Sequence, residues 1–201
     1  MFQKWRKLLV WNDNNNIYTK PLYLQGFFIF RDMKKNLLIS FLVLVAMIFI
    51  MRWQGNSLIT PQSPNGVLDL EFAKTPEKFY QLRLFWNERN IRLNIFLDFL
   101  FIASYVWFLL AACNFVKSRI TRIKLTNLFT SLVIAAGLFD VCENFLMLLV
   151  LNGRFSPNIL QVVYYCAALK FILAGLTVLY LLLSLPFLFH RRLWIFTVFL
   201  W

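Results

Sequence analysis

The stretch LTNLFTSLVIAAGLFDVCENFLMLLVL, residues 125–151, decides the fold class. At about 1.5 Å per residue, a helix of this length covers about 40 Å, which is enough to cross a bilayer. Its only charged residues are Asp140 and Glu143. An apolar run of this length is typical of a transmembrane helix and is rare in soluble domains.

Three further apolar runs follow the same pattern, and with the first they predict four membrane spans. The predicted spans are residues 37–53, 93–116, 125–151 and 159–185. The whole chain has 201 residues, of which 60% are hydrophobic and 15% charged, whereas about a quarter of the residues of a soluble domain are charged. The sequence therefore predicts an all-α integral membrane four-helix bundle, residues 37–190, and excludes a soluble globular domain.

The two ends of the chain are predicted to lie at the membrane surface. Residues 1–36 mix basic and aromatic side chains, which favours an interfacial helix on anionic lipid or on a cytoplasmic partner. The candidate contact residues are Lys4, Trp5, Arg6, Lys7 and Trp11. Residues 191–201 are too short to span and are predicted to form an interfacial tail.

Residues 54–92 connect the first two spans, and they are predicted to begin as turns and to end as a helix. Thr75-Pro76-Glu77 has the residue types of a helix N-terminus: a hydroxyl cap, a proline at the first helical position and an acid in the first turn. Neither glycine nor proline follows before Gly137. This pattern predicts one extended helix that starts near Thr75, lies outside the membrane and continues into the second span.

Orientation follows from the basic residues, of which the chain has 21 against nine acids. Lys and Arg collect in the cytoplasmic connections of membrane proteins. The short connection between the second and third spans holds four of them, namely Lys117, Arg119, Arg122 and Lys124. The sequence therefore predicts that this connection and both termini are cytoplasmic.

Four charged residues fall inside the predicted spans, and they are the first candidates for a functional site. They are Asp98, Asp140, Glu143 and Lys170. Each costs about 3 kcal/mol at the bilayer centre, so each is expected to face a partner or a cavity. Asp140 and Lys170 lie at similar depth on neighbouring spans, which predicts an ion pair. Asp98, Glu143 and Asn144 are expected at a second level nearer the outer side, and Tyr105 shares the helical face of Asp98.

Two interpretations of these polar residues stay open. They are either a polar network that holds the bundle together or the lining of a hydrated path or gate. Three acids against one base favour the second. Enzyme chemistry is not predicted, because no Gly-x-Ser-x-Gly or His-Glu-x-x-His motif occurs and no Gly-x-Gly-Asp surrounds Asp98 or Asp140. We expect no cofactor and no metal.

Four short motifs lie in the outer connection and the last three spans. They are LDLEFA at residues 68–73, LDFLF at 97–101, DVCEN at 140–144 and LKF at 169–171. In this order they resemble a family of bacterial four-span membrane proteins, one branch of which accompanies the RNA-guided RNA nuclease of type VI-B (subtype VI-B1) CRISPR systems. The resemblance covers about residues 60–180 and adds Asp69 and Glu71 of the outer connection to the candidate residues.

The resemblance implies an accessory membrane protein that modulates an RNA-targeting CRISPR effector, as an oligomeric pore or gate. Its implied partners are the bilayer, further copies of the chain and the RNA-guided nuclease, with nucleic acid only as a passenger. Four helices around a filled core leave no room for a nucleic-acid strand, so a pore would need several subunits. Two alternatives stay open: a channel or scaffold of a DNA-uptake system linked to natural transformation, and a small ion- or proton-linked transporter.

Overall fold

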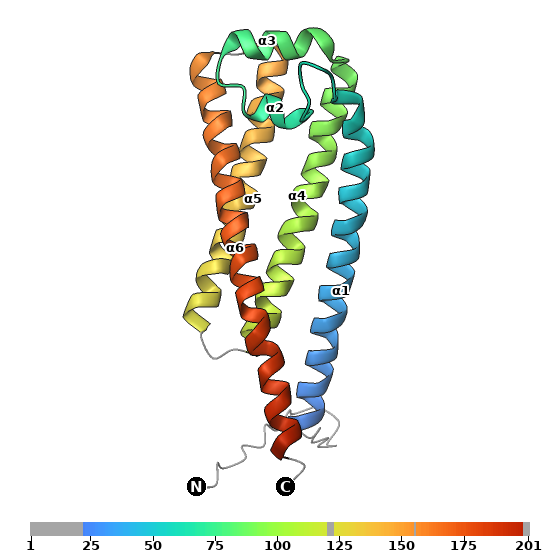
Figure 1. Ribbon diagram of the computed structural model, residues 1–201, viewed down its shortest axis with the longest axis vertical. Coiled ribbons are helices and arrows are strands. Elements are labelled where there is room, and N and C mark those ends of the chain that lie inside the picture. Colours follow the sequence, from blue (N-terminus) through green and yellow to red (C-terminus); the bar gives the residue numbers. More distant parts are fainter. Residues whose placement is uncertain (1–21, 120–122, 155, 199–201) are drawn as a thin grey trace, which may run out of the picture.

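The computed structural model describes residues 22–119, 123–154 and 156–198, and its regular elements are helices (Figure 1). Their bounds are α1 Leu22–Gly55, the 3-10 turn η1 Asn56–Leu58, α2 Val67–Glu71, α3 Pro76–Phe85, α4 Glu88–Lys117, α5 Ile123–Leu151 and α6 Pro157–Val198. The predicted all-α fold class is confirmed. Outside the helices, the described part of the chain has one isolated bridge between Thr60 and Ser63.

Four of these helices are long and apolar enough to cross a membrane, which makes the chain a multi-pass membrane protein. The stretches that meet this condition are Asp32–Leu58, Glu88–Lys117, Lys124–Leu151 and Pro157–Pro186. Many of their side chains are apolar and exposed, as Phe49, Leu138 and Leu183 illustrate. Such a surface suits contact with lipid. The first of these stretches is the least buried of the four.

The short elements η1, α2 and α3 form a cap, residues 56–87, over one end of the four helices (Figure 1). α3 runs across that end, and α2 lies below it in the mouth of the bundle. The start of α1, the end of α4, the start of α5 and the end of α6 all lie at the opposite end. The long connection between the first two membrane helices thus lies at one end of the bundle, as the predicted topology requires.

The four long helices are arranged as an incomplete ring. α4 packs against α1 and α5, and α6 packs mainly against α5, whereas α1 and α6 make few contacts with each other. The cap end is filled by a cluster of apolar side chains that includes Leu58, Phe79, Leu82, Ile95 and Leu160. A second, smaller cluster around Leu109, Cys113 and Val133 packs α4 against α5 farther from the cap, while the bundle stays open between α1 and α6.

Two helices are longer than the predicted spans. α1 begins at Leu22 rather than near residue 37, and α6 continues through Pro186 to Val198. Residues 191–198 are therefore helical and continuous with the fourth span, and their interfacial position stays a prediction. Charged residues end an apolar run without ending a helix, because Lys and Arg are good helix formers. Pro186 removes one backbone hydrogen bond without ending the helix.

The extended helix predicted from Thr75 is in fact two helices. The predicted start is confirmed, since Thr75 accepts a hydrogen bond from the backbone amide of Lys78 and Pro76 opens α3. The chain then leaves the helix at Trp86, and Asn87 caps α4 by accepting from the amide of Arg89 at 2.9 Å. The break between α3 and α4 is marked by the N-cap residue of α4, an asparagine, and not by a glycine or proline.

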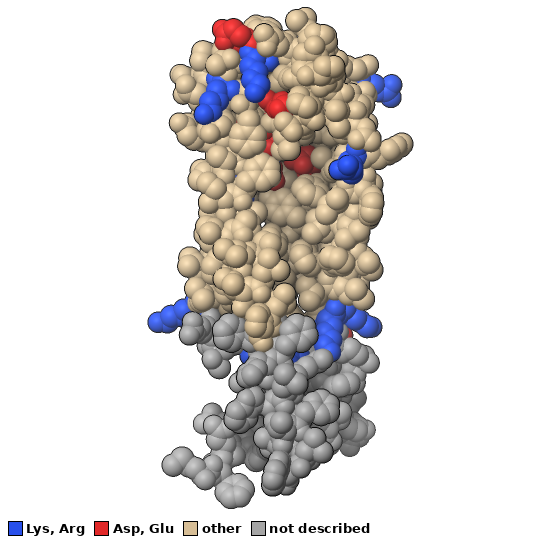
Figure 2. Space-filling view, in the orientation of Figure 1, with Lys and Arg blue, Asp and Glu red and all other residues tan. Residues whose placement is uncertain are grey.

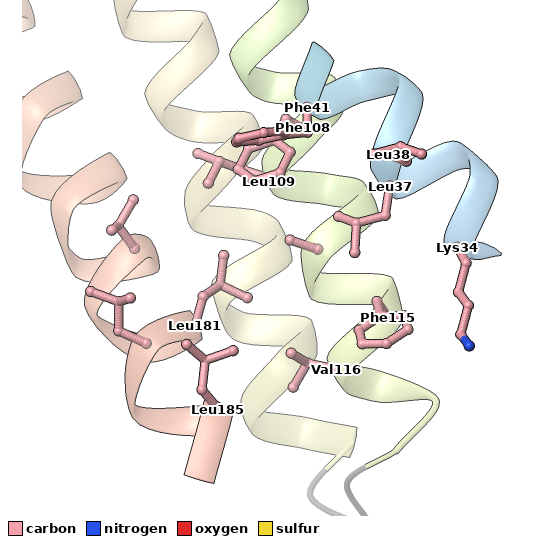
Figure 3. Close-up of a pocket in the computed structure, with 13 residues that line it drawn as sticks. Lys34, Leu37, Leu38, Phe41, Phe108, Leu109, Phe115, Val116, Leu181 and Leu185 are labelled. Atoms are coloured by element: carbon pink, nitrogen blue, oxygen red, sulfur yellow. The ribbon is translucent and has the colours of Figure 1, made fainter. Parts of the chain in front are cut away.

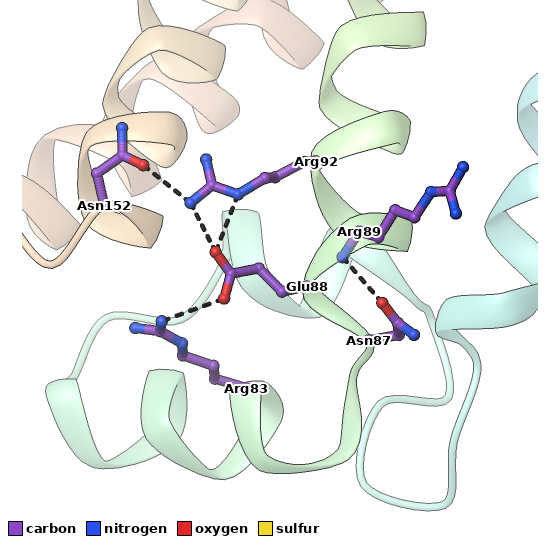
Figure 4. Close-up of polar contacts among 6 residues, drawn as sticks. All are labelled: Arg83, Asn87, Glu88, Arg89, Arg92 and Asn152. Carbon is purple, nitrogen blue, oxygen red and sulfur yellow. Dashed lines mark hydrogen bonds and ion pairs between the residues drawn. The ribbon is translucent and has the colours of Figure 1, made fainter.

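A small polar network holds the corner between α3 and α4 (Figure 4). The Glu88 carboxylate forms ion pairs with Arg92 at 2.7 Å and with Arg83 at 3.6 Å. Arg92 also donates a hydrogen bond to Asn152 Oδ1 at 2.8 Å. These contacts join α3, the start of α4 and the turn after α5. The two ion pairs are half-exposed and add little stability, so the network mainly fixes the direction of the corner.

Gly137 marks the closest approach of α5 to α4. A Cβ atom at this position would lie 2.8 Å from Val106 Cγ2, whereas one at Gly175 on α6 would meet nothing within 4 Å. We expect Gly137→Leu to lower the free energy of unfolding by about 2–3 kcal/mol, because α4 and α5 must separate. Gly175→Leu is the matched control and should have little effect. Denaturant unfolding in detergent measures both, and equal effects would contradict the close approach.

Candidate functional site

The strongest concentration of polar contacts inside the bundle surrounds Lys170. Its side chain extends from α6 to three carboxylates: Glu71 Oε2 at 3.2 Å, Asp140 Oδ1 at 2.8 Å and Glu143 Oε2 at 2.9 Å. We call these four residues the Lys170 cluster. An ammonium group has three protons, so three acceptors match its capacity. The contact with Asp140 is also a hydrogen bond, and the other two are ion pairs.

The cluster is almost completely shielded from solvent. The exposed fractions are 5% for Glu71, 4% for Asp140, 0% for Glu143 and 7% for Lys170. Buried ion pairs contribute little net stability, but removing one partner leaves an uncompensated charge, which is costly. Loss of any one member would therefore leave buried charge on its partners without full compensation.

Helix geometry explains why Glu71 faces inward and Asp69 does not. Residues two apart on a helix lie on nearly opposite faces. Asp69 faces out and holds the preceding turn, because its carboxylate accepts from the backbone amide of Asn65 at 2.9 Å and from Asn65 Nδ2 at 3.1 Å. Gly66, with φ at 62°, allows the turn that places α2 in the bundle mouth. Glu71, the last residue of α2, then reaches Lys170.

Two hydrogen bonds extend the cluster toward α4. Tyr105 Oη donates to Asp140 Oδ2 at 2.9 Å, and Asn144 Nδ2 donates to Asp98 Oδ2 at 2.6 Å. Counted along their helices, Asp98, Asp140 and Lys170 lie about 15–20 Å from the cap end, so their depths agree. The site thus receives side chains from α2, α4, α5 and α6.

The predicted Asp140–Lys170 pair is confirmed. The proposed second level is only partly correct, because Asn144 does contact Asp98 but Glu143 joins Lys170 instead. Glu71 was a motif residue with no predicted contact, and the structure adds it to the intramembrane site. Only the placement of α2 brings it there, and no pattern in the sequence near Glu71 predicts that placement.

Burial in the bundle mouth raises the pKa of the Glu71 carboxyl above its ordinary value, and the Lys170 ammonium opposes this rise. Ionised Glu71 therefore depends on Lys170. Four carboxyl groups, those of Glu71, Asp98, Asp140 and Glu143, share this region with one ammonium group. The carboxyl groups outnumber the ammonium group, so the site favours the binding of a further positive charge.

The arrangement is suited to ion pairing and to holding a cation. Within the described ranges, no three His, Cys, Asp or Glu residues are placed to hold a metal ion. No hydrogen bond between Asp98 and Asp140 is among the contacts of the described residues. What the site can do is link α2 to α5 and α6, because Lys170 joins acids from the cap and from α5.

The candidate surface residues near the N-terminus fall outside the described ranges. They are Lys4, Trp5, Arg6, Lys7 and Trp11. Their interfacial role stays a prediction. In comparisons with protein-family models, curated proteins and solved structures, nothing matches this chain.

Proposed function

We propose that this chain is an accessory membrane protein that modulates an RNA-guided, RNA-targeting CRISPR effector, and that it acts as an oligomeric gate in the bacterial inner membrane. One observation carries the proposal. The four motifs that resemble the CRISPR-associated family lie far apart in the sequence, yet each contributes a side chain to the same buried region: Glu71, Asp98, Asp140 and Lys170. Shared motifs that meet at one place are expected where a family keeps a common working part.

The gate would work through the cap. Glu71 belongs to α2 and Lys170 to α6, so their ion pair holds the cap down on the bundle. If Lys170 keeps only Asp140 and Glu143, α2 loses its charged contact with the membrane helices. α2 is also held by apolar packing, because Leu70 lies in the core cluster at the cap end. Loss of the ion pair would shift the balance between a bound and a released arrangement of the cap, as a switch requires. A nucleic-acid passenger would need several subunits and a basic path, because the acids near Lys170 repel phosphate.

The proposal is tested by expressing the chain together with its effector and measuring interference against phage or plasmid. Wild-type protein should change interference, Lys170→Met should abolish the change, and Lys78→Met should retain it. Lys78 is the matched control because it is exposed on α3. Glu71→Gln leaves Lys170 with two carboxylates and should still insert, so it tests the cap contact if Lys170→Met is poorly produced. An unchanged effector in the presence of membrane-inserted wild type would refute the proposal.

Orientation is a separate prediction. We expect the end opposite the cap to be cytoplasmic, because the connection there holds Lys117 and its basic neighbours. In a background without Cys113, Cys142 and Cys166, a cysteine at exposed Ser118 should react only after permeabilisation. A cysteine at exposed Asn65, in the cap, should react in intact spheroplasts. The reverse pattern would invert the topology and place the cap on the effector's side.

A further inference from the structure

A groove runs along the open side of the bundle between α1 and α6. It consists of two cavities, one of about 450 Å³ near the cap and one of about 510 Å³ toward the opposite end. Both cavities are lined by Phe108, Leu109 and Val178, so they lie next to each other along the bundle. Figure 2 shows acidic side chains at the floor of a hollow on this face. Because α1 and α6 belong to the membrane spans, the groove opens sideways toward lipid.

The cap half of the groove combines negative charge with aromatic rings. Its lining includes the carboxyl-bearing residues Glu71, Asp98 and Asp140 and the aromatic residues Phe101, Tyr105 and Phe171. Glu71 Oε2 is fully enclosed and accepts no hydrogen bond, although Lys170 is close to it. Carboxylates beside aromatic faces are the usual surroundings of a bound organic cation.

The other half of the groove is apolar (Figure 3). Phe41, Phe115 and Leu181 are typical of its walls, and Lys34 is the charged residue among the described side chains that line it. From Lys170 to Leu181 the groove follows 11 residues of α6, or about 16 Å, which is the length of a medium hydrocarbon chain. A basic residue at this far end and acids near the cap give the groove a polarity that selects the orientation of a bound molecule.

We infer that the groove binds a lipophilic cation, with its positive group among Glu71, Asp98 and Asp140 and its hydrocarbon chain in the apolar half. Charge complementarity argues for this occupant, because four carboxyl groups share the region with one lysine. An anionic lipid would be repelled there, and a neutral chain would leave the acids unmatched. Such a cation can arrive from the bilayer through the open side without passing the cap.

The inference deepens the proposed function, since it rests on the same cluster and names a ligand that competes with Lys170 for its acids. A cation that takes Glu71 from Lys170 would release α2, and so would act on the proposed gate. Binding itself does not depend on a nuclease. Purified protein can therefore test the ligand while the interference assay tests the function.

The test uses the full chain in phosphatidylcholine nanodiscs and dodecyltrimethylammonium as the probe, with empty nanodiscs subtracted. We expect saturable binding by titration calorimetry. A sulfobetaine with the same dodecyl chain should bind at least about tenfold more weakly, because its sulfonate opposes the acids. Butyltrimethylammonium should also bind more weakly, because it leaves the apolar half empty. Equal binding of the cation and the sulfobetaine would overturn the inference.

Two variants locate the site. Glu71→Gln with Asp98→Asn removes two wall charges and should weaken dodecyltrimethylammonium by at least about tenfold. Asp32→Asn with Glu77→Gln removes two exposed charges and should leave binding unchanged. Ala112→Phe fills the apolar half and should reduce the advantage of the dodecyl chain over the butyl chain. If the first variant does not fold, the Ala112 result decides, and an undiminished chain-length effect there would contradict the groove as the site.

Discussion

Lys170→Met should lower the free energy of unfolding by about 3–5 kcal/mol, because it leaves Glu71, Asp140 and Glu143 buried without a counter-ion. Methionine matches the length of lysine and fills the same space, so the loss measures charge rather than a cavity. Denaturant unfolding in detergent provides the measurement. The control is Lys78→Met, which removes an exposed charge and should change stability by less than about 0.5 kcal/mol.

A second variant separates a pair from a cluster. In a simple Asp140–Lys170 pair, Lys170→Met combined with Asp140→Asn would regain most of the lost stability. In the four-residue cluster the double variant still leaves Glu71 and Glu143 without a cation, so it should regain only part. Neutralising Glu71 and Glu143 as well should regain more. Full recovery in the double variant would show that the other two contacts contribute nothing.

The same variant has a pH signature through Glu71. Burial raises the pKa of this carboxyl in the folded protein, so the fold favours its protonated form. Stability from such a group is present below the unfolded pKa of about 4.3 and falls as pH rises toward the folded pKa. Without Lys170 to oppose the rise, Lys170→Met should lose stability more steeply above about pH 4.3 than wild type. A flat profile would argue against burial of Glu71 in the folded variant.

Trp86→Ala is expected to have the other large effect, a loss of about 3–5 kcal/mol, and to concentrate it in the cap. Trp86 is buried at the corner between α3 and α4, and its Nε1 donates to Leu58 O at 2.8 Å and to Ser63 Oγ at 3.0 Å. Removal of the indole leaves a cavity and takes one donor away from Leu58 O and from Ser63 Oγ, which remain hydrogen-bonded to each other. Hydrogen exchange should quicken across residues 56–87.

Two controls interpret the Trp86 result. Trp86→Phe keeps a ring but not the donor and should cost about 1–3 kcal/mol. Trp53→Ala removes a tryptophan that is 81% exposed and should leave exchange in the cap unchanged. Uniform exchange across all helices in Trp86→Ala would mean that the cap and the bundle unfold as one unit.

The four membrane helices and the Asp140–Lys170 pair could be predicted because they depend on local hydrophobicity and on equal depth along adjacent spans. The break at Trp86 could not, since it depends on a buried indole and an asparagine cap rather than on glycine or proline. The contact of Glu71 with Lys170 was not predicted, for a related reason. This contact exists only after the cap folds back into the bundle mouth, and hydrophobic periodicity carries no information on that step.

The gap between α1 and α6 was also beyond sequence reasoning. Four amphipathic spans were expected to close around a filled core. Closure, however, depends on how side chains of the first and last helices meet, and these helices are separated by most of the chain. The groove lies where α1, which packs mainly on α4 with a few contacts to η1, leaves a gap to α6.

The length of α6 has a mechanical consequence. Its 42 residues extend about 63 Å, roughly twice the thickness of the hydrocarbon core. A rod of that length works as a lever: a small sideways push at its far end becomes a torque near Lys170. The amide missing at Pro186 makes that position the softest point of the rod. α6 thus connects its C-terminal end mechanically to the contact between Lys170 and the cap. A bend at Pro186 would change how much movement is passed along the helix.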